Sequence, residues 1–177
     1  MVLYLNTSND YGVVELPKFD ELTVIVHLII ERKLPQLKSY RWLLRGDVAL
    51  VMWNDHDSAA NSMGQGVRVR DLSKNVILHL VAALDTEHLE SYVWAGAGAV
   101  DGSTEMTVYY GSAKDYSAFS IDIAKYGDYV VEFAGGSLRL EGGNPMFVRN
   151  LYVYSKVLSI YEYESIINNP YNPPRNS

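Results

Sequence analysis

Apolar and polar positions alternate through most of the chain, a pattern that predicts β-strands. The clearest run spans residues 22–30, where every second residue is aliphatic and the intervening Thr23, Ile25, His27 and Ile29 form a mixed face. An aliphatic face of this length must pack against another layer, so we expect a second sheet on that side. The mixed face can border a cleft or a further layer.

Similar runs, separated by turn signals, follow one another along the sequence. We expect strands at 2–5, 12–16, 22–31, 40–45, 48–53, 67–70, 76–84, 88–95, 105–110, 118–123, 128–133, 138–140 and 146–154. Gly135-Gly136 and the stretch 142–145 are typical turn sequences between them. Many short strands at this spacing predict an antiparallel sandwich or barrel.

The last strand runs directly into the one predicted helix. Its alternation predicts one face made by Phe147, Leu151 and Val153 and another made by Asn150, Tyr152 and Tyr154, with Arg149 as a polar break. Ser159 and Glu162 have the spacing of a capping box, in which each side chain binds the other residue's backbone amide. We therefore expect a helix from Ile160, with Ile166 and Ile167 packed on the sandwich. Asn168-Asn169-Pro170 ends it after about two turns.

This closing strand and capped helix resemble the C-terminal signature of laminin G-like and other concanavalin A-like jelly rolls. Three other segments resemble family motifs in the same order: residues 10–17 an early "Y-V-x-L-P" strand, 42–51 a central hairpin, and 75–96 the strand pair that ends in "Y-V-D-G". The resemblance implies an all-β sandwich of two antiparallel sheets over residues 1–168, with the last strand beside an N-terminal one. An extended or disordered tail would follow at 169–177.

The sequence departs from this family at positions that some relatives use for ions or turns. Arg149 and Asn150 replace the paired acids of the closing strand, and Trp94 or Ala95 replaces the aspartate before the glycine of "Y-V-D-G". These departures weaken the transfer of a metal site from the resemblance.

Composition fits one globular domain and excludes several classes of function. The chain has 177 residues, of which 48% are hydrophobic and 20% charged, and no apolar run approaches the ~18 residues of a membrane-spanning helix. The absence of cysteine excludes disulfides and thiolate chemistry. A net charge of −6 argues against binding to the phosphate backbone of nucleic acids. The N-terminus lacks the pattern of a secretory signal, which leaves localisation open.

Aromatic residues are the compositional feature most relevant to binding. The chain holds 14 tyrosines and 3 tryptophans, and their rings can stack on the apolar C–H faces of sugars or pack in strands. The candidates for a ligand surface are Trp53, Tyr92, Trp94, Tyr109 and Tyr110. Trp94 is the strongest of them, because it is expected at the end of a strand before a flexible segment at 95–99.

An acidic loop follows the strand that ends at Trp53. Asn54, Asp55 and Asp57, with His56 and Asn61 nearby, offer the oxygen-rich ligands that calcium prefers, so a weak calcium site is one interpretation. A solvated turn is the other. His27, His79 and His88 are widely spaced in strand patterns and are expected to be hydrogen-bonded sheet residues.

Motifs for catalysis are absent. The E-x-D-x-E strand of glucanases on this fold does not occur, nor do G-x-S-x-G or H-E-x-x-H sequences. Arg45-Gly46-Asp47 spells an adhesive tripeptide, but a Gly-Asp pair between two strands is also what a hairpin turn requires.

These observations favour a non-catalytic, lectin-like module that recognises a glycan or a glycoprotein surface, with no nucleic acid and no membrane insertion. The alternative is a structural protein of a virus or phage particle, because the ending "N-P-Y" at 169–171 resembles laminin G-like domains of virion proteins. Such a role implies a homo-oligomer or virion assembly. A glycoside hydrolase is the third hypothesis.

Overall fold

The computed structural model describes residues 3–7, 9–30, 37–54, 61–71, 73, 76–86, 92–99, 105–112, 116–122, 128–142 and 146–169. Thirteen strands and one helix lie in these ranges. The strands are β1 (Leu3–Leu5), β2 (Tyr11–Leu16), β3 (Leu22–Ile30), β4 (Leu37–Arg45), β5 (Val48–Asn54), β6 (Asn61–Asp71), β7 (Val76–Thr86), β8 (Tyr92–Ala99), β9 (Glu105–Ser112), β10 (Tyr116–Asp122), β11 (Tyr129–Val131), β12 (Gly136–Glu141) and β13 (Met146–Tyr154). The helix α1 spans Ile160–Asn168.

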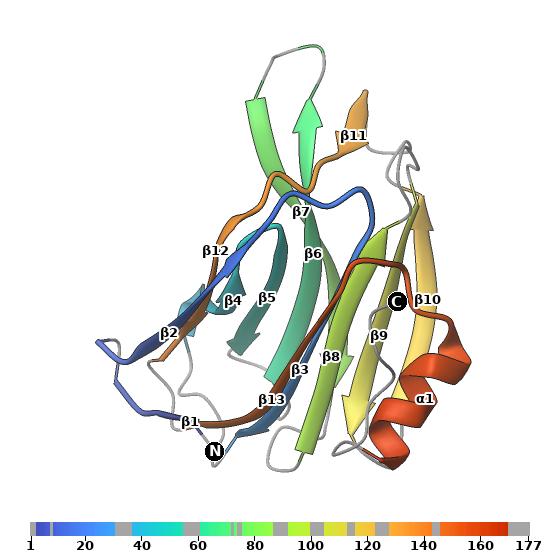
Figure 1. The fold of residues 1–177 in the computed structure, drawn as a ribbon. Helices are drawn as coiled ribbons and strands as arrows, with labels where there is room; N and C mark the ends of the chain where they lie inside the picture. The colour runs from blue at the N-terminus through green and yellow to red at the C-terminus, as the bar shows by residue number, and fades with distance from the viewer. Residues whose placement is uncertain are drawn as a thin grey trace.

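These strands form two antiparallel sheets that face each other (Figure 1). The six-stranded sheet has the order β1-β13-β3-β8-β9-β10, and the seven-stranded sheet contains β11-β6-β5-β4-β12-β2, with β7 also paired to β6. Strands β5 and β6 of the second sheet contact β8 of the first, as expected for a sandwich. The predicted architecture, an all-β sandwich of two antiparallel sheets with a short C-terminal helix, is confirmed.

Strand β3 lies in the middle of the six-stranded sheet and shows why its sequence alternates. Leu22, Val24 and Val26 are buried on the face toward the second sheet. On the opposite face, Ile25 packs under α1, so a further layer covers this part of the mixed face. The described part of the chain has no helix long and apolar enough to cross a membrane.

Strand β13 pairs with both β1 and β3, which confirms the expected neighbour of the last strand. The pairing with β3 shifts between Val148 and Asn150, so Arg149 is an extra residue in a β-bulge. Because one extra residue reverses the alternation, Phe147 lies on the face opposite to Leu151 and Val153. The prediction of one shared face for these three residues was therefore wrong.

The helix begins as the sequence predicts. The Glu162 amide donates to Ser159 Oγ and the Ser159 amide donates to Glu162 Oε1, both at 3.2 Å. Lys156 Nζ lies 2.7 Å from Glu162 Oε2, and this hydrogen bond is the main reason that the pKa of Glu162 is lowered. The Asn169 amide donates to the Ser165 carbonyl at the other end, which closes the last turn.

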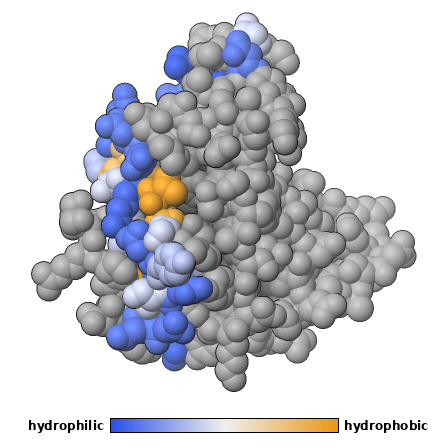
Figure 2. Space-filling model, turned by 90° about the vertical axis from the view of Figure 1, so that its right-hand side faces the viewer, coloured by the Kyte–Doolittle hydropathy of each residue, from blue (hydrophilic) through white to orange (hydrophobic). Residues whose placement is uncertain are grey.

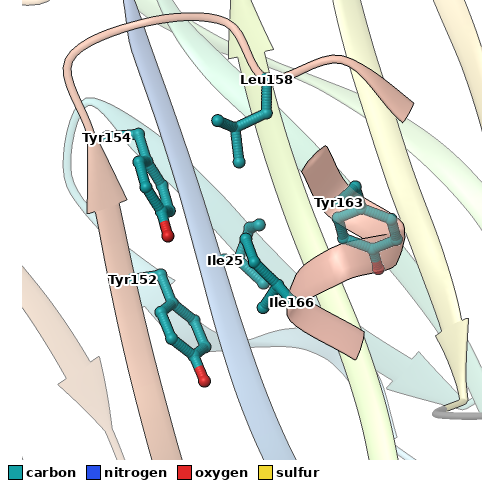
Figure 3. Close-up of a cluster of buried hydrophobic side chains, with 6 residues drawn as sticks. All are labelled: Ile25, Tyr152, Tyr154, Leu158, Tyr163 and Ile166. Atoms are coloured by element: carbon teal, nitrogen blue, oxygen red, sulfur yellow. The ribbon is translucent and has the colours of Figure 1, made fainter. Parts of the chain in front are cut away.

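A buried cluster joins α1 to the outer face of the six-stranded sheet (Figure 3). Ile25 from β3 and two tyrosines from β13 meet three residues of the C-terminal segment; the full set is Ile25, Tyr152, Tyr154, Leu158, Tyr163 and Ile166. The expected packing of Ile166 is confirmed, while the side chain of Ile167 lies outside the described residues.

A buried hydroxyl holds the loop that leads into the helix. Thr23 is fully buried on β3; its Oγ1 donates to the Lys156 carbonyl at 2.8 Å and accepts from the Leu158 amide at 3.2 Å. We expect Thr23→Val to lower the free energy of unfolding by about 1–3 kcal/mol, because both backbone groups lose a partner in a buried place. Thr23→Ser keeps the hydroxyl and is the matched control. Urea unfolding measures both, and equal stability of the Val and Ser variants would contradict the role of the hydroxyl.

Several predicted strand limits were wrong. The segment 95–99 was expected to be a flexible loop, but it continues β8 to Ala99 and pairs with β3 and β9. Strand β6 begins already at Asn61 and is therefore longer than the predicted 67–70. Conversely, the predicted strand at 128–133 is only the short β11. Pairing with neighbouring strands decided these limits more than local composition did.

The Arg45-Gly46-Asp47 sequence is a hairpin turn between β4 and β5. The side chain of Asp47 is only 2% exposed, and its Oδ2 accepts from the Gly135 amide at 2.8 Å. A carboxylate enclosed in this way is not available to an adhesion receptor. The structure therefore supports the turn interpretation of this tripeptide.

Candidate functional site

The strand pairing does not bring the five predicted aromatic positions to one surface. Trp53 lies on β5 in the seven-stranded sheet, whereas the other four lie on β8 and β9 in the six-stranded sheet. Within that sheet, Tyr109 pairs with Gly96 and Tyr110 with Ala95, so these two tyrosines occupy opposite faces. Tyr92, Trp94 and Tyr109 occupy the same face as Ile25, because Ile25 pairs with Gly96.

Two polar residues extend this aromatic face onto the neighbouring strands. Trp94 on β8 pairs with His27 on β3, and His27 pairs with Asn150 on β13. The three positions form a row across adjacent strands, which we call the His27 row. Tyr92 and Tyr109 flank it on the same face. From the sequence, His27 was predicted only as a sheet residue and Asn150 was assigned no role, because their alignment with Trp94 depends on strand register.

The bulge at Arg149 sets this row. Asn150 comes directly after the extra residue, and its Nδ2 donates to His27 Nδ1 at 3.4 Å. Without the bulge, the side chain at position 150 would belong to the face toward the second sheet. Bulges are common next to functional sites, where they redirect a side chain.

His27 is neutral at physiological pH. Its residue is only 4% exposed, and this burial, followed by the positive charge of Arg149, lowers the pKa of the imidazole to about 4. A neutral imidazole that accepts from Asn150 through Nδ1 carries its proton on Nε2. The row therefore presents hydrogen-bonding groups rather than a charge.

The lowered pKa of His27 predicts a loss of stability in mild acid. Because the neutral form is favoured in the fold, the unfolded chain takes up a proton near pH 6.5 while the native chain does so near pH 4. Stability is thus complete above pH 6.5 and falls as the pH is lowered through this window, by about 3 kcal/mol at most. Urea unfolding at several pH values should show a smaller loss for His27→Gln than for the wild type. Parallel pH profiles would contradict this assignment.

The proposed calcium ligands are only partly described. Asn54 is the last residue of β5, while Asp55 and Asp57, with His56, lie outside the described residues. The weak calcium site stays a prediction. Within the described ranges, no group of three or more His, Asp or Glu side chains could hold a metal ion.

The chemistry of the His27 row suits recognition of a neutral, hydroxyl-rich ligand. Aromatic positions would provide apolar faces, and the Asn150 amide would provide polar groups beside them. His27 itself is buried, so we expect it to hold Asn150 in place rather than to contact a ligand directly.

No protein-family model and no curated protein sequence matches the chain. Solved structures that are similar in fold at low identity include the following three. A legume lectin-like domain from Entamoeba histolytica has a TM-score of 0.46 at 10% identity, over 89% of this chain and 84% of that one. A functionally unknown protein from Saccharomyces cerevisiae gives 0.49 at 8%, over 89% and 97%. An alginate lyase from Klebsiella pneumoniae gives 0.42 at 10%, over 75% and 59%.

Proposed function

We propose that the chain is a non-catalytic carbohydrate-binding module whose ligand contacts the face of the six-stranded sheet that carries Tyr92, Trp94 and Tyr109. One observation carries the proposal: the register aligns Trp94 with His27 and Asn150 across three adjacent strands. Sugars bind where an aromatic face lies beside directional hydrogen-bonding groups, because their rings have apolar C–H surfaces and polar edges.

Absence of catalysis is part of this proposal. Hydrolysis of a glycoside usually requires two carboxyl groups on one surface, about 5–10 Å apart. The His27 row holds an imidazole, an amide and an indole position instead. Incubation with β-glucans, galactans and alginates should release no reducing ends. Release that one Asp or Glu substitution abolishes would replace the binding module with an enzyme.

A structural role in a larger assembly is the second candidate, and one observation favours it. The edge strand β2 leaves the side chains of Tyr11, Val13 and Val14 exposed. A glycan array run with calcium and with a chelator separates the two functions, because only the binding module retains a sugar. It also tests the calcium prediction, since retention that the chelator abolishes would require a metal.

A further inference from the structure

Exposed apolar side chains gather on the two strands that end the sheets on one side of the sandwich. Strand β1 ends the six-stranded sheet and β2 ends the seven-stranded sheet. Among the side chains that the structure describes, the large exposed hydrophobic ones on these strands are Leu3, Tyr4, Tyr11, Val13 and Val14, and only Tyr161 lies elsewhere. On the side shown in Figure 2, the described residues form a mostly hydrophilic strip with one small hydrophobic area. An apolar edge of this kind marks an interaction surface.

The backbone of β2 is oriented for further pairing. The Gly142 amide donates to the Asp10 carbonyl at 2.9 Å, one residue before the β2–β12 ladder starts at Tyr11 and Glu141. Hydrogen bonding alternates along an antiparallel pair, so Gly12, Val14 and Leu16 bond to β12. The amides and carbonyls of Tyr11, Val13 and Glu15 therefore point away from β12, toward the edge where no described strand pairs with β2.

The edge has little of the usual protection against pairing. Strand β2 is a continuous run of six residues whose pairing with β12 has no bulge; it contains neither lysine nor proline, and its one charged residue is Glu15. Pro17 follows only after the strand has ended. Natural edge strands that stay unpaired are usually short, bulged or guarded by such residues.

We propose that β2 pairs antiparallel with β2 of a second copy of this chain, with Val13 opposite Val13 of that copy, so that the seven-stranded sheet continues from one sandwich into the next. The charges of Glu15 and Arg139 favour this register over others. Glu15 then lies opposite Tyr11 of the second copy, and the Arg139 guanidinium lies 4.1 Å from the centre of the Tyr11 ring in each copy. Glu15 of each copy thus lies near Arg139 of the other copy, whose Nε also lies 3.5 Å from Glu141 Oε1 of its own copy.

The same register matches apolar groups on the inner face. Val14 lies opposite Gly12 of the second copy. Leu3 Cδ2 lies only 3.0 Å from the point that a Cβ at Gly12 would occupy, so the Leu3 side chain fills the space left by that glycine. Val14 and Leu3, which are both partly exposed in one copy, would cover each other across the interface. A two-fold axis at Val13 repeats each contact, as an isologous dimer requires.

Charged substitutions at Val13 test the proposal. Sedimentation of the full chain over a concentration series should show a dimer. Val13→Lys and Val13→Glu each place like charges opposite one another, and we expect each to weaken dimerisation about tenfold or more. An equimolar mixture of the two variants should restore a dimer, because Lys then faces Glu. Tyr161→Lys, on the exposed side of α1, is the matched control and should leave dimerisation unchanged.

Hydrogen exchange gives a second measurement that does not depend on variants. The amides of Tyr11, Val13 and Glu15 should exchange more slowly at high protein concentration than at low concentration. A wild-type chain that stays monomeric at all concentrations would overturn the proposal. It would do so even if these amides exchange slowly, because another segment of the same chain would then protect them. A dimer that survives both Val13 variants unchanged would overturn it as well.

Discussion

Replacing Tyr163 by alanine is expected to lower the free energy of unfolding by about 3–5 kcal/mol, the range for removing a large aromatic side chain from a core. Tyr163 is completely buried between α1 and the six-stranded sheet, within the cluster that includes Ile25 and Tyr152. Its removal leaves a cavity at the centre of that contact. Because α1 has only nine residues and is too short to be stable alone, the helix should detach first.

Tyr161 provides a matched control on the same helix. It lies two residues before Tyr163 but is 78% exposed, so Tyr161→Ala truncates a tyrosine side chain that lies in solvent rather than in the core. We expect a change within about 0.5 kcal/mol. Urea unfolding, followed by circular dichroism, measures both variants. Similar losses for the two would mean that the helix does not depend on this buried contact.

Asp47→Ala is the second substitution with a large expected effect, also about 3–5 kcal/mol, because it removes a buried carboxylate that pairs with the partly exposed Arg68 and accepts from a backbone amide. Asp47 Oδ1 lies 3.5 Å from Arg68 Nη1, while Oδ2 accepts from the Gly135 amide. Gly135 has a φ of 78° and no room for a Cβ beside the backbone of Leu16 and Pro17. The carboxylate thus fixes a turn that only glycine can make, at the start of β12.

Two further variants divide the contribution of Asp47. Asp47→Asn keeps an oxygen that can accept from the Gly135 amide but removes the charge, so its loss of stability should be smaller than that of Asp47→Ala. Asp20→Ala, at an exposed carboxylate, should change little. Thermal unfolding gives all three values. A stability of Asp47→Ala equal to that of Asp20→Ala would contradict the structural role of this turn.

The elements with strong local signals could be predicted from the sequence. Alternation located β3, and the Ser159–Glu162 spacing located the start of α1, because both signals depend on residues close in the chain. The alternating alanines and glycines at 95–99 led to the wrong prediction of a flexible segment, since both residues have a low intrinsic preference for strands. Pairing with β3 and β9 nevertheless holds this segment as strand, and Gly96 and Gly98 pair with Ile25 and Thr23, below the helix and its leading loop.

The candidate site was harder to predict because it depends on register. Trp94 was expected near the end of a strand, but it lies near the start of β8. Its alignment with His27 and Asn150 joins residues 67 and 56 positions away (94 − 27 and 150 − 94). The Arg149 bulge, which sets the last of these pairings, appeared in the sequence only as a polar break. Similarly, the partners of Thr23 and Asp47 are distant in sequence, so no local pattern indicated them.

Titration of the best glycan from the array into the wild type, Trp94→Ala and Trp53→Ala tests the proposed binding face most directly. We expect Trp94→Ala to weaken binding about tenfold or more, and Trp53→Ala, in the other sheet, to leave it unchanged. Asn150→Ala, which alters the same row, should also weaken binding and provides an answer if Trp94→Ala fails to fold. Unchanged affinity in folded Trp94→Ala and Asn150→Ala, or loss of binding in Trp53→Ala alone, would contradict a binding site on the His27 row.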